Sequence, residues 1–415
     1  MIRFEKTILS NGLRVLVHHD PTTPLAVVNL LYDVGARDEA PHRTGFAHLF
    51  EHLMFEGSEN IPEFDIMLQH AGGENNAFTT NDLTNYYISV PAQNLETALW
   101  LESDRMMGLA FSEEKLRIQK NVVIEEFRQS YLNQPYGDVW MLLRSLAYKV
   151  HPYQWSTIGK NIDHIQQVTL EDVKGFFNTF YHPGNVVLTI AGNVDPVKVF
   201  SLAEKWFGDI PSKEQPAREL LEEPEQTTQR RLRVERDVPY HQLVMSFPSP
   251  ARQHEGFYAI DLLSDVLANG SSARLIQQLV KTKKLFIEVN AYLSGSIDPG
   301  QFLITGKLTE GTSIEHAEQA IWEELDKLAQ EPLSERELQK VKNKVEASQV
   351  FSESSVLAKA INLAYYELLG DASLINDQMT HYFAVTPQMM QQAAIGLFKP
   401  EKASVLHYCA RSASH

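Results

Sequence analysis

An internal repeat constrains the fold of this chain more than any other feature. The pattern Ser-Glu-x-x-Leu-x-x-x-Lys-Asn-x-Val occurs at residues 112–123 and again at residues 334–345. A second match pairs the stretch from Val168 to Pro183 with the stretch from Val385 to Pro400. Both matches are separated by about 220 residues and occur in the same order, which indicates two copies of one unit of ordinary domain size.

The residues between the two copies have the composition of a linker. Residues 211–228 are polar, contain prolines and have few large apolar side chains, as flexible connections do. We therefore expect a first domain at residues 1–210, a linker at 211–228 and a homologous second domain at 229–415.

Each copy mixes strands with helices. Short runs rich in Val and Leu predict strands, and longer runs with helical spacing predict helices. Strands at both ends of a copy with helices between them favour an α+β fold over strict βαβ alternation. In the first copy the predicted strands are residues 15–19, 26–34, 85–90 and 186–191, and the predicted helices are residues 45–55, 94–107 and 113–131.

Composition restricts the class of protein. The 415 residues are 43% hydrophobic, which is enough for two domain cores, and no apolar run approaches the roughly 20 residues that span a bilayer. The net charge of −16 argues against nucleic acid and anionic membranes as partners. A single cysteine, Cys409, and a start without an apolar signal stretch indicate a cytoplasmic location, with a removed signal peptide as the alternative.

The run His48-Leu49-Phe50-Glu51-His52 has the clearest chemistry. Two histidines four residues apart on a helix project from one face, so both imidazoles can bind one metal ion. Glu51 shares the edge of that face. This is the H-x-x-E-H order of the inverted zinc peptidases, and zinc suits imidazole and carboxylate ligands. The alternative is a structural role, because histidines on apolar helices are often core residues with satisfied hydrogen bonds.

A catalytic zinc ion usually takes three protein ligands and a water molecule. The best candidates for the third ligand are Glu125 and Glu126, which project about 100° apart on a helix. Only one of them would face the metal, and periodicity alone leaves the choice open. The second copy has Ala347 and Ser348 at the equivalent positions and no histidine in residues 265–274. Metal chemistry therefore belongs to residues 1–210.

Three runs resemble the pitrilysin/insulysin family of zinc peptidases. They are Val34-Gly35-Ala36-Arg37-Asp38-Glu39, the stretch from Gly45 to Ser58, and Asn76-Ala77-Phe78-Thr79. The resemblance spans nearly the whole chain, and the length is similar to the short branch that includes the mitochondrial processing peptidase and its bacterial relatives. In that branch two chains close like a clamshell around a peptide-sized chamber, so this chain would form half of a clamshell.

The resemblance implies a role for each matching residue of the metal site. His48 and His52 would be zinc ligands, and Glu51 would be the general base. The third ligand of the family ends a Val-x-x-Glu stretch, which places it at Glu126. Glu125 would then support the site or face solvent.

The resemblance also implies substrate-binding residues. The run Asn76-Ala77-Phe78-Thr79 would lie on the edge strand that family substrates extend. In the second copy, relatives carry an Arg and, about thirteen residues later, a Tyr within a run like Gly-Leu-Ala-Tyr. Here Arg274 is present, but the run is Lys284-Leu285-Phe286-Ile287, with Ile287 in place of the Tyr. Many relatives also carry a Glu seven residues before the third ligand, where this chain has Gln119.

Together these features predict a zinc endopeptidase with one Zn²⁺ per chain, which hydrolyses peptides or unfolded segments inside a dimeric chamber. The missing Tyr leaves two assemblies open, a homodimer and a heterodimer with a family member that lacks zinc but carries the Arg/Tyr pair. A non-catalytic assembly or core subunit of the same fold is the alternative function. Such members typically lose part of the metal motif, which is intact here. A metallohydrolase for other substrates is a further alternative.

Overall fold

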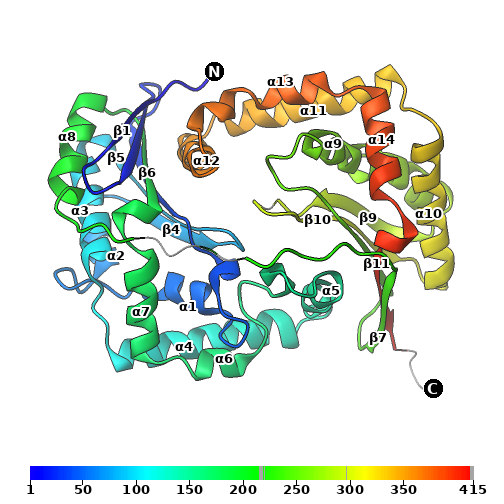
Figure 1. Ribbon diagram of the computed structural model, residues 1–415, viewed down its shortest axis with the longest axis horizontal. Helices are drawn as coiled ribbons and strands as arrows, with labels where there is room; N and C mark the ends of the chain where they lie inside the picture. The colour runs from blue at the N-terminus through cyan, green and yellow to red at the C-terminus, as the bar shows by residue number, and fades with distance from the viewer. Residues whose placement is uncertain (215–217, 219, 296, 412–415) are drawn as a thin grey trace. The chain divides into compact units, whose positions relative to one another are not determined.

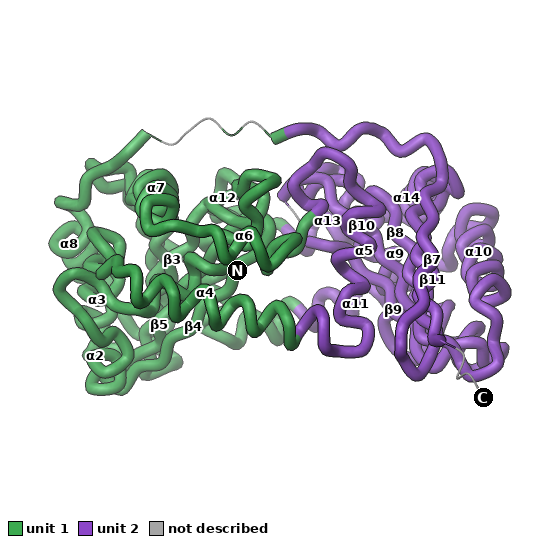
Figure 2. The backbone as a smooth tube through the Cα atoms, turned by 90° about the horizontal axis from the view of Figure 1, so that it is seen from below, with its two compact units in different colours: residues 1–129, 155–220, 349–377 green, residues 130–154, 221–348, 378–415 purple. Residues whose placement is uncertain are grey.

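The computed structural model of the protein describes residues 1–214, 218, 220–295 and 297–411. The chain divides into two units, which are coloured separately in Figure 2. The first unit comprises residues 1–129, 155–220 and 349–377, and the second comprises residues 130–154, 221–348 and 378–415. Each unit thus contains one segment from the other half of the chain. Within the described ranges, no helix is long and apolar enough to cross a membrane.

Six strands form the sheet of the first unit, in the order β1-β2-β6-β3-β5-β4. Figure 1 labels β1, β4, β5 and β6 of this sheet. Neighbouring strands are antiparallel except β2 and β6, which are parallel. β4 lies at one edge of the sheet, so Asn76–Thr79 occupy an edge strand as predicted. The bounds are β1 Glu5–Ile8, β2 Arg14–His19, β3 Leu25–Tyr32, β4 Glu74–Thr79, β5 Thr84–Pro91 and β6 Val186–Gly192.

Five strands form the sheet of the second unit, in the order β7-β11-β8-β10-β9. β7 and β11 are parallel and the other neighbours are antiparallel. This order repeats β2-β6-β3-β5-β4 of the first sheet strand for strand, which confirms the two-copy, mixed α/β plan expected from the sequence. The bounds are β7 Arg230–Arg236, β8 Gln242–Pro248, β9 Phe286–Leu293, β10 Gln301–Leu308 and β11 Ser404–Ala410.

Helices pack on the first sheet from both parts of the sequence. α3 and α8 contact strands β2, β3 and β5, whereas α12 contacts β3 and β6. The buried residues Leu363 and Ala364 of α12 belong to one apolar cluster with Leu16, Leu31 and Val187 of the sheet. The helices of this unit are α1 Phe46–Leu53, α2 Phe64–His70, α3 Leu95–Met107, α4 Glu113–Phe127, α6 Ile162–Gln166, α7 Leu170–Phe180, α8 Pro196–Phe207 and α12 Val356–Leu368.

The second sheet is covered in the corresponding way. α5 (Val139–Ala147), which precedes the linker in sequence, packs on β7, β8 and β11, and its residues Val139 and Leu143 share a core with Val244 and Leu406. The larger core of this unit lies among β8–β10 and the remaining helices. Those helices are α9 Phe257–Ala268, α10 Ile314–Gln330, α13 Gln378–Ala384 and α14 Pro387–Leu397, and α11 Glu335–Ser352 runs from this unit into the first.

The predicted elements of the first copy are present with small differences at their ends. The predicted helix at residues 113–131 ends as an α-helix at Phe127 and continues as one π-helical turn, Arg128–Leu132. The repeated motifs lie on matching elements, the first on α4 and α11 and the second on α7 and α14. The domain limits at residues 210 and 229 stay a prediction. The two units do not divide there alone, because unit 1 includes residues 349–377 and unit 2 includes residues 130–154.

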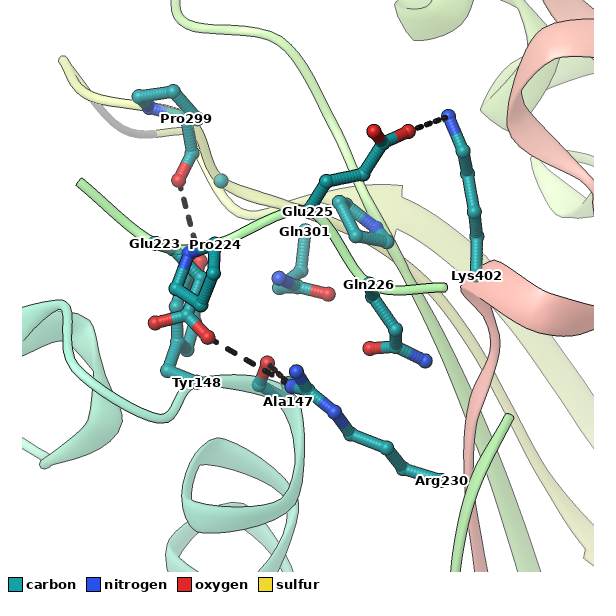
Figure 3. Close-up of a pocket in the computed structure, with 12 residues that line it drawn as sticks. Ala147, Tyr148, Glu223, Pro224, Glu225, Gln226, Arg230, Pro299, Gln301 and Lys402 are labelled. Carbon is teal, nitrogen blue, oxygen red and sulfur yellow. Dashed lines mark hydrogen bonds and ion pairs between the residues drawn. The ribbon is translucent and has the colours of Figure 1, made fainter. Parts of the chain in front are cut away.

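The end of the predicted linker is bound to the second unit. The carboxylate of Glu223 accepts hydrogen bonds from the backbone N–H groups of Lys149, Val150 and His151, at 2.8–3.0 Å. Glu223 also lines a pocket of about 120 Å³ that Arg230 and Gln301 share (Figure 3). The linker is therefore anchored from this point onward. Its residues 215–217 and 219 lie outside the described part of the chain.

Candidate metal centre

The helix α1 is held at its N-terminus by a glycine and a buried glutamate. Gly45 precedes the helix with φ of 86°, and a Cβ atom there would lie 2.6 Å from the backbone oxygen of Ile158. A side chain is therefore excluded by both conformation and space. The Glu39 carboxylate accepts hydrogen bonds from the N–H groups of Gly45 and Ala47, at 2.9 and 2.8 Å. Together these contacts fix the direction of the helix that carries His48, Glu51 and His52.

The helix α4 begins at a capping serine and packs against α1. Ser112 accepts a hydrogen bond from the Lys115 N–H at 3.2 Å, which satisfies one of the free N–H groups of the first turn. Val123, Ile124 and Phe127 are buried, and α4 contacts α1. This packing turns the side chain of Glu126 toward the two histidines.

The two imidazoles and one carboxylate meet at a single point. The Glu126 Oε2 atom lies 3.8 Å from His48 Nε2 and 3.6 Å from His52 Nε2, and one ligand atom from each residue lies within 4.8 Å of the other two. Among the residues that the structure describes, this is the one group of three or more His, Cys, Asp or Glu close enough to hold a metal ion. Tetrahedral zinc places its nitrogen and oxygen ligands about 3.4 Å apart, so the donor set and its spacing fit zinc.

The electrostatic environment favours the metal-binding forms of two of these groups. Burial lowers the pKa of His48 to about 4, which keeps its imidazole neutral at physiological pH. The contact with His52 lowers the pKa of Glu126, so the carboxylate is charged. The same contact is the main reason that the pKa of His52 is raised. A metal ion binds neutral imidazole and charged carboxylate, so its binding would displace a proton carried by His52.

Glu51 lies beside the metal-binding group and has a partner of its own. The Thr79 hydroxyl, at the end of β4, donates a hydrogen bond of 2.5 Å to Glu51 Oε2. Burial raises the pKa of Glu51, and this hydrogen bond opposes the rise. A carboxylate held by one oxygen retains the other for accepting a proton, which is the arrangement that a general base requires.

Gln119 supports the site from the same face of α4 as Glu126. Its amide Nε2 donates a hydrogen bond to Glu56 Oε1, and the Gln119 side chain also lies against His52, where it adds to the rise in the pKa of that imidazole. Metal-binding histidines usually have such a second polar partner. Gln119 thus lies where its amide can orient the His52 imidazole.

The remaining predicted site residues lie in different surroundings. Glu125 is exposed and forms an ion pair with Arg128 at 3.5 Å, so the structure brings Glu126 rather than Glu125 to the histidines. In the second unit, Arg274 forms a two-point ion pair with Glu337 of α11, at 2.9 and 2.8 Å. Ile287 lies on β9 with 46% of its surface exposed. Whether these residues contact substrate stays a prediction.

Two supporting residues were missed from the sequence. Glu39 ends one of the three runs that resemble the family, but its contact with α1 spans a turn whose shape no spacing encodes, so its role was not predicted. Thr79 was expected to bind substrate through its strand, and the hydrogen bond of its hydroxyl to Glu51 links two segments that periodicity treats separately. Contacts of this kind depend on the tertiary fold.

Comparisons with known proteins place the chain in a family. Residues 14–161 match the family described as insulinase (peptidase family M16), and residues 167–345 match the peptidase M16 inactive domain. The zinc protease PqqE of Helicobacter pylori is 30% identical over 97% of this chain and 92% of its own length. The uncharacterized zinc protease YmxG of Bacillus subtilis is 28% identical over 95% of this chain and 96% of its own length.

Solved structures agree with the sequence comparisons. The crystal structure of a protease from Helicobacter pylori matches with a TM-score of 0.93 and 29% identity, over 98% of this chain and all of the other. The inactive-domain match includes residues 265–274, the stretch equivalent to the His48–His52 motif, in which the sequence has no histidine. The chain therefore belongs to peptidase family M16, the pitrilysin/insulysin family that its motifs resemble.

Proposed function

We propose that this chain is a zinc-dependent endopeptidase that hydrolyses peptides or unfolded segments. The observation that carries the proposal is the convergence of His48, His52 and Glu126 on one point, with the Glu51 carboxylate beside it. Relatives that are named zinc proteases support the same metal and the same class of reaction. The three residues would hold one zinc ion per chain.

The protein groups have separate tasks in the proposed reaction. Zinc, when bound, would supply Lewis-acid polarisation of the scissile carbonyl and lower the pKa of a water molecule toward about 7. Glu51 takes a proton from the attacking water and later delivers it to the leaving amine. His48 and His52 act as neutral ligands, and Glu126 contributes the negative charge of the site.

Substrate would bind in extended form along β4. This strand has β5 on one side and is the last strand of its sheet, so its outer backbone groups are available to pair with a peptide. β4 also ends at Thr79, which contacts Glu51. An added strand would therefore pass close to the base and the metal ligands.

The assembly is part of the proposal. Ile287 occupies the position at which relatives carry a substrate-binding Tyr, while Arg274 is already paired with Glu337. We favour a heterodimer in which a family member without zinc supplies the Arg/Tyr pair, and a self-sufficient homodimer is the alternative. Cleavage by the purified chain alone distinguishes the two.

The test compares the wild-type chain with Glu51→Gln on a mixed peptide pool, with bound zinc measured in both. The expected result is about one zinc ion per chain in both proteins, and cleavage that falls by about 10²- to 10⁴-fold in the variant, as for the loss of a general base. Glu310→Gln, the same change at an exposed residue in the turn between β10 and α10, is the control and should cleave like the wild type.

Three other outcomes have definite meanings. Full activity in Glu51→Gln would exclude Glu51 as the base. Zinc without cleavage in the wild type, restored by adding a family member that carries the Arg/Tyr pair, would establish the heterodimer. Absence of bound zinc after purification in zinc-containing buffer would reject the catalytic proposal and favour a non-catalytic subunit of the same fold.

A further inference from the structure

Thr79 connects the substrate edge of the sheet to the base. Its hydroxyl donates to Glu51 Oε2 at 2.5 Å, while its backbone belongs to β4 and pairs with Thr84 of β5. Side chains alternate between the two faces of a strand, so the neighbouring Phe78 points the other way and packs against the apolar cluster that includes Leu363. One face of the strand end is thus anchored in the core, and the other carries the hydroxyl that contacts Glu51.

The turn after Thr79 fixes this hydroxyl relative to α1. The Thr80 hydroxyl accepts a hydrogen bond from the backbone N–H of Leu83 at 3.1 Å. The backbone N–H of Thr80 donates to the Leu83 carbonyl oxygen at 2.8 Å. The same turn is hydrogen-bonded to the segment before α1. The N–H of Ala36 donates to the Thr80 carbonyl oxygen at 3.1 Å, and the N–H of Arg37 donates to the Asn81 carbonyl oxygen at 2.8 Å.

The chain of contacts closes on the helix that carries the base. Glu39 follows directly after the short helix Ala36–Asp38 and accepts hydrogen bonds from the first turn of α1. A closed loop of contacts therefore runs from β4 through the turn and Glu39 to α1, and the hydrogen bond between Thr79 and Glu51 completes it. These backbone contacts hold the Thr79 hydroxyl opposite the Glu51 carboxylate, so the position of the hydrogen bond does not depend on the two side chains alone.

We propose that Thr79 is a positioning residue for the reaction, which orients the Glu51 carboxylate. This inference rests on the proposed peptidase function. A hydroxyl suits the task because it donates to Oε2 both when Glu51 is ionised and when the other oxygen carries the transferred proton.

The proposal predicts an effect on turnover rather than on binding. Thr79→Val keeps the shape and β-branching of the side chain but removes the hydroxyl, and Thr79→Ser keeps the hydroxyl. We expect Thr79→Val to lower kcat by about 10- to 100-fold, the usual effect of losing a group that orients a catalytic site. KM, bound zinc and the unfolding midpoint should stay close to the wild-type values, and Thr79→Ser should recover most of kcat.

A second measurement separates positioning from substrate contact. Peptide affinity is measured by fluorescence anisotropy for Glu51→Gln and for Glu51→Gln combined with Thr79→Val, so that no turnover interferes. Equal affinities support the proposal, because the hydroxyl then acts through Glu51. A lower affinity in the double variant would overturn it and make Thr79 a substrate-binding residue.

Outcomes of the kinetic test are equally decisive. A Thr79→Val chain with wild-type kcat, or a Thr79→Ser chain as slow as Thr79→Val, overturns the positioning role while leaving the peptidase function intact. A wild-type chain that binds zinc but cleaves no peptide, alone or with a family partner, overturns the proposed function and removes the reaction in which Thr79 would act.

Discussion

Adjacent glutamates on α4 have opposite environments, although the sequence alone leaves the choice between them open. Glu126 faces both histidines, whereas Glu125 pairs with Arg128 and accepts a hydrogen bond from Gln129. The difference arises from the packing of Val123, Ile124 and Phe127 into the core, which sets the rotation of the helix. The buried side chains on one face of α4 thereby bring Glu126, and not Glu125, to the two histidines.

The first prediction uses this pair as its own control. Glu126→Gln should weaken zinc binding by more than about 100-fold, because even residues outside the ligand set typically contribute 10- to 100-fold. Glu125→Gln should bind zinc like the wild type. The measurement is competition with a chromophoric chelator. Equal losses in the two variants would mean that general negative charge, and not direct ligation, governs zinc affinity.

Lys284 adopts a conformation that suits glycine. Its φ is 52°, in the left-handed region where residues other than glycine are strained by about 1–2 kcal/mol. Lys284 begins the run Lys284-Leu285-Phe286-Ile287, and a glycine at its first position would relieve the strain. The placement of Ile287 at the Tyr position of the family stays a prediction.

The second prediction follows from this strain. Lys284→Gly should stabilise the second unit by about 0.5–1 kcal/mol, because relief of strain exceeds the entropy that a glycine adds to the unfolded chain. Lys284→Ala is the control and should give no comparable gain, since alanine meets the same restriction. Urea unfolding followed by a tryptophan probe measures both. An equal gain from alanine would place the effect in the lysine side chain.

At the scale of elements, α1 depends on the buried acid that caps it. Burial raises the pKa of Glu39 to about 8, against the hydrogen bonds from the first turn of the helix. Because the pKa of Glu39 is higher in the folded chain than in the unfolded chain, the folded chain binds one more proton at pH values between the two. Stability contributed by this group is therefore fully present below about pH 4.5 and is lost as the pH rises toward 8.

The third prediction is the pH dependence that results. Between pH 5.5 and 8, the wild-type chain should lose more stability than Glu39→Gln, whose neutral amide cannot titrate. Glu39→Gln should be less stable at pH 5.5, where it loses one acceptor, and should approach the wild type near pH 8. Thermal unfolding at several pH values checks this. Parallel curves for the two proteins would show that Glu39 is ionised throughout.

The contact between α1 and α4 also depends on one polar pair near the histidines. Gln119 donates to Glu56, and Lys115 of the same helix donates to the Glu56 backbone oxygen. A carboxylate at residue 119 would face the carboxylate of Glu56. The amide at residue 119 and the acid at residue 56 are therefore matched to one another in this chain.

The fourth prediction is a double-mutant cycle on this pair. Gln119→Glu alone should destabilise the chain by about 1–3 kcal/mol through the lost donor and the facing charges. Adding Glu56→Gln reverses donor and acceptor, so the double variant should recover most of that loss. Its zinc affinity should match or exceed the wild-type value, because a carboxylate is a stronger partner for a ligand imidazole. Additive losses would show that the two side chains do not interact.

At the scale of the whole molecule, each sheet is covered by a helix from the other half of the sequence. α12 packs on β3 and β6, and ion pairs of Lys359 with Asp20 and of Glu367 with Lys6, at 2.7 and 2.5 Å, hold it there. α5 packs on the second sheet, where Asp138 at its start pairs with Arg236 at 2.8 Å. Each of the two units thus contains one helix from the other half of the sequence, which is an exchange of helices between the two halves.

This exchange marks the limit of prediction from sequence. Periodicity predicted four strands and three helices of the first copy, and the repeat predicted that the two copies share one fold. α12 and α5 are both amphipathic. The spacing of their apolar residues does not indicate which of the two sheets each helix covers. That choice depends on long-range packing of side chains such as Leu363, as does the orientation of Thr79 toward Glu51.

The fifth prediction tests the exchange by dividing the chain within the linker. Residues 1–214 alone would lack α12 and leave an apolar sheet face uncovered, and burial of each large side chain there contributes about 1.5–3 kcal/mol. We expect this fragment to be aggregated or unfolded, and residues 220–415 likewise, because they lack α5. Expressed together, the fragments should form one stable complex, measured by copurification and circular dichroism.

A control distinguishes exchange from simple instability of a cut chain. Proteolysis of the intact protein within residues 213–218 should leave both fragments associated and the unfolding midpoint nearly unchanged, since Glu223 anchors the second fragment beyond the cut. A soluble 1–214 fragment with a native circular dichroism spectrum and one bound zinc would contradict the exchange. In that case residues 1–210 would be a domain in the full sense, and α12 would be a peripheral addition to its sheet.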